Sequence, residues 1–173
     1  MKKIITLTLF LAVVAGLSGA ALSYVNGITA PIIAEAAIAA EKENLVKIYP
    51  SAEFKAIEPA DLKDYPSITG VYEAVGSGYV YKCSVVGYGG ASTPIVYLIA
   101  LDNDGTYKGY EVIDCSGETS GFGDKVGQDD FKNSIVGKNI GDTIDTISGA
   151  TISSTAVRNG IKDATAHFEA NYK

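Results

Sequence analysis

The residues from Asp145 to Ser154 are the stretch of this sequence whose types and spacing best suit a chemical task. They read Asp-Thr-Ile-Ser-Gly-Ala-Thr-Ile-Ser-Ser and stand where apolar residues begin to recur at helical spacing. Free backbone N–H groups and about half a positive charge at a helix N-terminus can cradle a phosphate. Gly149 and Ala150 would let a ligand approach the backbone closely. The stretch lacks the lysine of a Walker loop, so it is not the phosphate loop of an NTPase.

The same residues also fit an ordinary capped helix that binds nothing. Ser148 or Thr151 would then be the N-cap, because both side chains can accept a hydrogen bond from the first free N–H groups. The residue types alone leave both interpretations open.

A mixed α+β fold must position this stretch. Val157, Ile161 and Ala164 recur at helical spacing and predict a long helix over 148–172. A shorter helix is expected over 129–136. Short β-like runs predict five strands, over 53–58, 69–75, 78–86, 94–101 and 106–113. Residues 103–105 predict a hairpin turn before the last strand. This order of elements indicates one domain with an antiparallel sheet flanked by helices.

The N-terminal segment has no charged residue from Ile4 to Ala34, directly after Lys2 and Lys3. A helix over residues 4–25 would be about 33 Å long, which is enough to cross a bilayer core. The basic flank lies on the short N-terminal side, so we expect a single-pass protein of the cell membrane with a cytoplasmic N-terminus and an extracytoplasmic domain. Tyr24 and Asn26 would mark the interface and an exit turn.

A cleaved signal peptide is the alternative, with residues 18–20 as a small-residue cleavage site. Thr29 followed by Pro31 predicts the N-cap of a helix that ends before Pro50. This helix would either continue from the membrane span as a stalk or lie on the domain. The chain is therefore divided into an anchor over 1–27, a linker or stalk helix over 28–50 and a domain over 51–173.

Composition excludes several classes of function. The net charge of −6 argues against nucleic-acid binding, which needs clustered Lys and Arg. Two Cys and one His cannot build a four-ligand zinc site without carboxylates, and we predict no metal site.

The remaining polar and reactive residues have structural interpretations. His167 is expected on the surface or partly packed on the last helix. Cys83 and Cys115 could form a disulfide, be small core residues, or lie near a partner's redox centre. The tyrosines that alternate along strands are expected to be sheet residues, namely Tyr79, Tyr81 and Tyr107. The carboxylates of Asp102, Asp104, Asp129 and Asp130 are expected to be loop and cap residues and not a metal site.

The pattern Asp145-x-x-Ser-Gly-Ala-Thr151 resembles the flavinylation motif of the FMN-binding domain family. That family includes flavoprotein components of the Rnf-type ferredoxin:NAD⁺ oxidoreductase and of the sodium-pumping NADH:quinone oxidoreductase. In the family the threonine of this motif carries FMN through a phosphoester bond, which a flavin transferase installs. The resemblance makes Thr151 the acceptor, with Ser153 as the weaker alternative.

Three other stretches resemble the family's pattern in the same order: Gly87-Tyr88-Gly89-Gly90 before Pro94, Glu118-Thr119-Ser120-Gly121-Phe122-Gly123, and Phe131 with Gly137-Lys138. Three residues separate Gly90 from Pro94, Ser120 stands where the family has proline, and Ser116 stands where many members have histidine. These departures concern the loop around the flavin and leave the attachment motif intact.

The resemblance, which is closest to the flavoprotein component of the Rnf-type complex, implies an electron-transfer protein with covalent FMN and no catalytic residues of its own. The complex would couple electron flow between ferredoxin and NAD⁺ to Na⁺ or H⁺ translocation. The expected partners are the other membrane subunits and a flavin transferase. The expected cofactor-binding residues are Thr151, Ser148, Gly149, Ala150, Glu118, Thr119, Gly121, Gly123, Tyr88 and Gly89. The alternatives are an independent membrane-anchored FMN protein or a flavin-free exported interaction domain.

Overall fold

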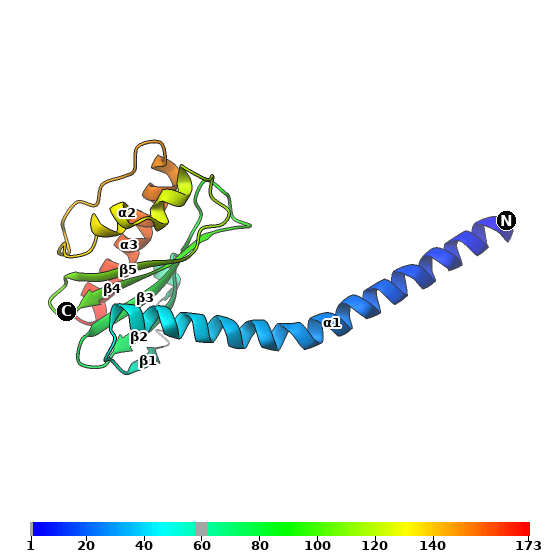
Figure 1. Cartoon of the computed structure of the whole chain (residues 1–173), viewed down its shortest axis with the longest axis horizontal. Helices are drawn as coiled ribbons and strands as arrows, with labels where there is room; N and C mark the ends of the chain where they lie inside the picture. The colour runs from blue at the N-terminus through cyan, green and yellow to red at the C-terminus, as the bar shows by residue number, and fades with distance from the viewer. Residues whose placement is uncertain (1, 58–61) are drawn as a thin grey trace. The chain divides into compact units, whose positions relative to one another are not determined.

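The structure is a computed structural model that describes residues 2–57 and 62–173, without the side chains of residues 2 and 30–41. The chain divides into two compact units, Met1–Lys42 and Glu43–Lys173. Each unit is described by itself, and Figure 1 shows the elements of both.

Helix α1 spans Lys2–Ile48; its residues up to Lys42 belong to the first unit, and its residues from Glu43 belong to the second. Residues Lys3–Thr29 are long and apolar enough to cross a membrane, and their side chains are unburied in the structure. A membrane anchor and a signal sequence both have this character. The expected N-terminal apolar helix is therefore confirmed.

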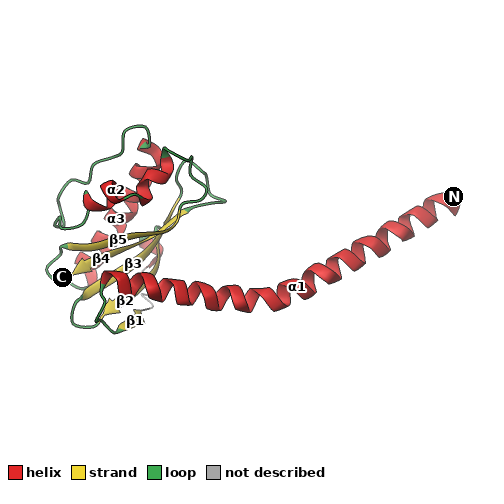
Figure 2. Ribbon diagram, viewed as in Figure 1, coloured by secondary structure: helices red, strands yellow, loops and turns green. Residues whose placement is uncertain are grey.

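The N-cap expected at Thr29 and the exit turn expected at Asn26 are wrong, because α1 continues without interruption through both residues, as the stalk interpretation expects (Figure 2). Thr29 does not cap a new helix. Its hydroxyl instead donates a hydrogen bond of 3.0 Å to the carbonyl of Val25, one turn earlier, as a threonine inside a helix commonly does. The predicted end of the helix before Pro50 agrees with the observed end at Ile48.

The second unit is built on a five-stranded antiparallel sheet, as predicted, and the strand order is β1-β2-β3-β4-β5. The strands are β1 (Phe54–Ile57), β2 (Ile68–Ala74), β3 (Gly78–Val85), β4 (Ile95–Asp102) and β5 (Tyr107–Asp114). The hairpin turn before β5 is also confirmed, with Gly105 at φ +91°. The predicted end of the first strand, Glu58, lies outside the described residues.

The two faces of the sheet have separate apolar cores, because successive side chains of a strand point to opposite faces. One core contains Tyr81, Tyr97 and Ile99 together with Ile161 and Phe168. Its helix is α3 (Thr151–Asn171), which lies against the sheet in Figure 1.

The other core contains Val80, Leu98 and Ala100 from the sheet. Leu45 and Tyr49 cover them, and these residues come from the end of α1 and the turn that follows it. The last turn of α1 is therefore structurally part of the domain.

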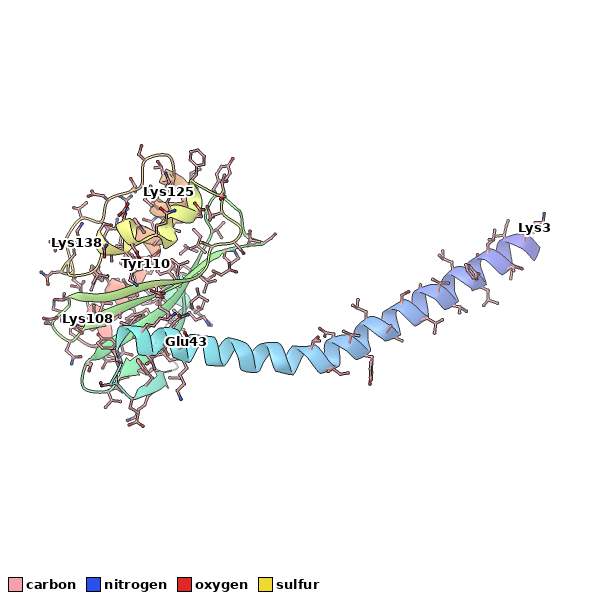
Figure 3. The ribbon with its side chains drawn as sticks, in the orientation of Figure 1. Lys3, Glu43, Lys108, Tyr110, Lys125 and Lys138 are labelled. Atoms are coloured by element: carbon pink, nitrogen blue, oxygen red, sulfur yellow. The ribbon has the colours of Figure 1, made fainter. Side chains whose placement is uncertain are left out.

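Short helices connect β5 to α3. The 3₁₀ helix η2 spans Gly123–Gly127, and α2 spans Asp129–Asn133, inside the predicted 129–136. A further 3₁₀ helix, η1, spans Leu62–Asp64. The Tyr110 hydroxyl donates to the carbonyl of Val126 at 3.0 Å and thereby ties η2 to β5 (Figure 3).

Both cysteines are unbridged, so the disulfide alternative is excluded. Cys83 is a core residue, and burial raises the pKa of its thiol to about 12. Cys115 is partly exposed, and its thiol pKa is raised first by burial and then by nearby carboxylates, of which Asp124 is the first.

The expectation that His167 is a surface or partly packed residue is wrong. Its side chain is fully buried, with Nδ1 3.1 Å from the hydroxyl of Tyr81. The rings of Tyr65 and Tyr81 pack edge-on against it, with centroids 5.2 and 5.5 Å away. The imidazole is therefore part of an aromatic cluster between sheet and helix.

The predicted loop position is confirmed for Asp104, whereas Asp102 is the last residue of β4, and Asp129 and Asp130 follow the N-cap Gln128 inside α2. Asp104 accepts a hydrogen bond from the N–H of Thr106 at 3.0 Å, and this bond lowers the pKa of the Asp104 carboxyl. Asp102 accepts from the Tyr49 hydroxyl at 2.5 Å. Asp129 and Asp130 lie in the first turn of α2.

Candidate functional site

The site is centred on the start of α3. Gly149 has φ +81°, a left-handed conformation that glycine adopts without steric cost, and it turns the chain into the helix. Ala150 is the N-cap residue and its side chain makes no capping hydrogen bond. Thr151 is the first helical residue, and its side chain is exposed.

The capping interpretation with Ser148 or Thr151 is therefore wrong. Ser154 stabilises this turn instead, from inside the helix. Its Oγ accepts from the N–H of Ile147 at 3.0 Å and donates to the carbonyl of Ala150 at 2.8 Å. The N-cap was predicted at the wrong residue because several Ser and Thr residues lie in this stretch. Only the folded backbone shows which of their hydroxyls contacts the turn.

A hollow of about 410 Å³ opens beside Thr151. Its volume lies in the range of about 300–1,000 Å³ typical of small-molecule sites. It is lined by three segments, namely the turn after β3, the loop at the start of η2, and the first turn of α3. The lining residues are Tyr88, Thr119, Phe122, Gly123, Gly149, Ala150, Thr151, Ile152 and Ser153.

Most of the expected cofactor-binding residues come together in this hollow. Thr151, Gly149, Ala150, Thr119, Gly123 and Tyr88 line it. Glu118, Gly89, Ser148 and Gly121 are not among the lining residues, although Glu118 accepts a hydrogen bond from the lining residue Ser153. Whether any of them contacts a cofactor stays a prediction.

Two lining residues were missed as site residues. Phe122 is 55 % exposed and Ile152 is 58 % exposed, although both are large and apolar. Phe122 also has the ammonium of Lys125 5.8 Å from its ring centroid. A usable signal was present in the sequence, because both residues stand beside the glycines and threonine of the motifs.

Glu118 is the one buried carboxylate of the site among the described residues, with 7 % of its surface exposed. Its Oε1 accepts a hydrogen bond from the N–H of Gly89 at 3.1 Å, and its Oε2 accepts one from the hydroxyl of Ser153. Both carboxylate oxygens are thus engaged by other parts of the site. This pairing is what a buried charge requires.

A second, more open hollow lies on the other side of the first turn of α3. It shares Thr151 and Ile152 with the first hollow and extends to Ser84 and Val86 at the end of β3. Thr151 therefore stands on the border between two concave surfaces.

The site combines an uncharged lining with a positive helix end. None of the described residues that line either hollow is charged. The first backbone N–H groups of α3 have no intrahelical acceptor and make the helix end attractive to an anion. This arrangement fits a ligand with a phosphate near Thr151 and a mostly apolar ring system in a hollow.

The fold and the site define an α+β domain with a hollow beside a helix N-terminus, an arrangement suited to a phosphate-bearing ligand. Residues 87–166 match the family model described as the FMN-binding domain. This range contains the turn after β3, the Glu118 loop and the start of α3. The match supports FMN as the ligand and a flavin-binding role in electron transfer. No curated protein gives a significant match to the chain.

Proposed function

We propose that this protein is an electron carrier with FMN bound covalently to Thr151 through a phosphoester. The observation that carries the proposal is the position of Thr151. Its exposed hydroxyl stands on the first residue of α3 at the edge of the hollow, inside the segment that matches the FMN-binding domain.

The neighbouring hydroxyls are less suitable acceptors. The side chain of Ser153 is 1 % exposed and donates to Glu118. Ser154 is fully buried and its Oγ serves the turn before the helix. Among the hydroxyls of the first turn of α3, that of Thr151 is the accessible one.

FMN would supply the redox chemistry through its isoalloxazine ring. The protein would bind, orient and shield it. The helix end would offset the phosphoester charge, and Tyr88, Phe122 and Ile152 would offer apolar contact to the ring. The residues present thus suit a relay of electrons, and the protein would not act as a stand-alone catalyst.

The N-terminal helix would anchor this domain in the cell membrane. Lys2 and Lys3 stand at the N-terminal end of the apolar span, Lys3–Thr29, which favours a cytoplasmic N-terminus and an extracytoplasmic domain. The resemblance of the motifs to the Rnf flavoprotein component extends the proposal to a complex. Its other membrane subunits would exchange electrons with the flavin between ferredoxin and NAD⁺, coupled to transport of Na⁺ or H⁺.

Flavin fluorescence after denaturing electrophoresis tests the attachment. The full chain, coexpressed with a flavin transferase, should give a fluorescent band. Thr151→Ala should abolish the band, whereas Ser153→Ala and Thr155→Ala should keep it. A dark wild-type band would refute the covalent flavin, and a band that depends on Ser153 would refute the acceptor.

Purification from the native membrane tests the complex separately. Copurification with other membrane redox subunits would support an Rnf-type assembly. A fluorescent protein that purifies alone would favour the independent FMN protein.

A further inference from the structure

The carboxylate of Glu118 is enclosed by three segments that are distant in sequence. Gly89 belongs to the turn after β3, Gly123 begins η2, and Ser153 lies in the first turn of α3. Glu118 receives a hydrogen bond from the first of these segments and another from the third. It therefore connects the two sides of the hollow that borders Thr151.

Two glycines show how tightly the carboxylate is held. A Cβ added to Gly87 would collide with Oε1 of Glu118, and a Cβ added to Gly123 would collide with Oε2. Any larger residue at position 87 or 123 would displace the carboxylate from its partners. The two glycines of the motifs thus make room for Glu118 as well as for a ligand.

The charge of Glu118 is also placed favourably. Ser153 is the third residue of α3, so the carboxylate lies beside the positive end of that helix. The helix end and two hydrogen bonds offset the cost of burying the charge. An apolar residue could fill the space but could not accept a hydrogen bond from either partner.

We propose that Glu118 is a positioning residue that fixes the Tyr88–Gly89 turn against the first turn of α3. Glu118 does not contact the ligand in this arrangement. It keeps Tyr88 on the wall of the hollow and so determines how rigidly the ring of the flavin is held. This inference rests on the proposed flavin at Thr151. The link that Glu118 makes between Gly89 and Ser153, here called the joint, is a property of the protein without flavin.

The joint is tested first on the full chain without flavin, by hydrogen exchange of the Gly89 amide. Glu118→Ala and Glu118→Met remove the acceptor, and Met fills most of the space. Exchange at Gly89 should be accelerated about tenfold or more in both variants, since a hydrogen bond to a charged acceptor is lost. Glu118→Gln keeps one oxygen for Gly89 and should retain protection. The Thr106 amide, held by Asp104, serves as the control that should not change.

The second test uses the flavin-loaded chain and measures the fluorescence anisotropy and visible circular dichroism of the native flavin. Both signals should fall in Glu118→Ala and Glu118→Met, should fall in Tyr88→Ala, and should be restored by Gln at position 118. A general loss of stability would not be confined to the Gly89 amide or rescued in this pattern. Glu111→Gln, which changes a carboxylate paired with Lys132 away from the hollow, is the matched control.

The outcomes separate the two proposals. Wild-type exchange at Gly89 and wild-type flavin anisotropy in a folded Ala or Met variant would overturn the role of Glu118. Loss of both Gly89 protection and flavin anisotropy in Glu118→Gln would also overturn the role of Glu118. If neither Glu118→Ala nor Glu118→Met folds, the Glu118→Gln result decides. A dark wild-type band would instead refute the flavin proposal, while the exchange data would still report on the joint.

Discussion

The hydroxyl of Tyr97, in β4, donates a hydrogen bond of 2.9 Å to the backbone carbonyl of Val157 on α3. Tyr97 is fully buried, and its ring packs at a tilt against Tyr110 with centroids 5.4 Å apart. A Cβ added to Gly160 would collide with the same hydroxyl and would lie 2.8 Å from Cγ1 of Val85. The helix that carries the candidate site therefore lies close to the sheet because residue 160 has no side chain.

Gly160→Ala should destabilise the domain by about 1–3 kcal/mol through overpacking. Helix propensity alone predicts the opposite, a gain of about 1 kcal/mol from replacing glycine by alanine. Chemical denaturation of the full chain in detergent measures the difference. The adjacent exposed residue provides the control, and Asn159→Ala should leave stability almost unchanged.

The cause can be isolated with Tyr97→Phe. By itself this variant should cost about 0.5–1.5 kcal/mol, because one buried hydrogen bond is lost. In its background Gly160→Ala should cost less than in the wild type, since the colliding hydroxyl is gone. Strict additivity of the two changes would contradict this account of the close approach.

The end of α1 should be needed for a stable domain. A fragment over 43–173 retains Leu45 and Tyr49, which are 4 % and 6 % exposed, whereas a fragment over 51–173 lacks both. Losing two buried side chains should cost about 3–6 kcal/mol and expose the second core. Thermal unfolding and binding of an apolar dye compare the fragments. Equal stability would support the predicted domain boundary at residue 51, which stays a prediction.

The domain should be labile at alkaline pH. Burial raises the pKa of Cys83 to about 12, and burial likewise raises the pKa values of Tyr97 and Tyr110 well above their usual range. In the unfolded chain these groups lose protons at about pH 9–10. Above that range the unfolded state binds fewer protons than the folded state, so the free energy of unfolding falls as pH rises.

Denaturation at successive pH values, with tyrosinate absorbance as a second probe, measures this effect. Tyrosinate absorbance from the buried tyrosines should appear together with unfolding. Cys83→Ala should weaken the decline of stability above about pH 9, apart from any constant cost of the cavity. A free energy of unfolding that stays level up to about pH 11 would contradict the expectation.

The sheet was predictable because its determinants are local. Runs of β-forming residues predicted the strand bounds to within one or two residues of those observed, and residues 103–105 predicted the last hairpin turn. The burial of His167 was not predictable, because its partner Tyr81 lies 86 residues earlier in the chain. The cap at Thr29 was wrongly predicted for another reason. A threonine before a proline is a valid cap signal, but a helix that is already formed can extend through it.

Within the site, the sequence could identify the residues around the hollow more readily than their roles. The motif placed Thr151, Gly149 and Ala150 at the start of α3, as observed. Glu118 could be named but not separated from residues that face the hollow, because its hydrogen bond to Ser153 spans 35 residues. Such long-range pairs depend on the packed fold and leave no local pattern.

Ser154 should control the shape of the attachment turn. Its Oγ holds the N–H of Ile147 and the carbonyl of Ala150, and so it fixes the four residues directly before Thr151. Ser154→Ala leaves the partly buried N–H of Ile147 without its acceptor and should cost about 1–2 kcal/mol. Thr155→Ala, at the next and partly exposed position, is the matched control and should cost less than about 0.5 kcal/mol.

Measuring flavin attachment in Ser154→Ala and Thr155→Ala separates the effect of the turn's conformation from the effect of overall stability. At a temperature where both variants are fully folded, Ser154→Ala should show a lower yield of fluorescent protein than Thr155→Ala, because Gly149 and Ala150 no longer hold one conformation beside the acceptor. The yield should stay low when cooling or a stabilising osmolyte restores the free energy of unfolding. A yield that recovers fully with stability would mean that Ser154 supports the fold alone, and that the geometry of the turn does not limit attachment at Thr151.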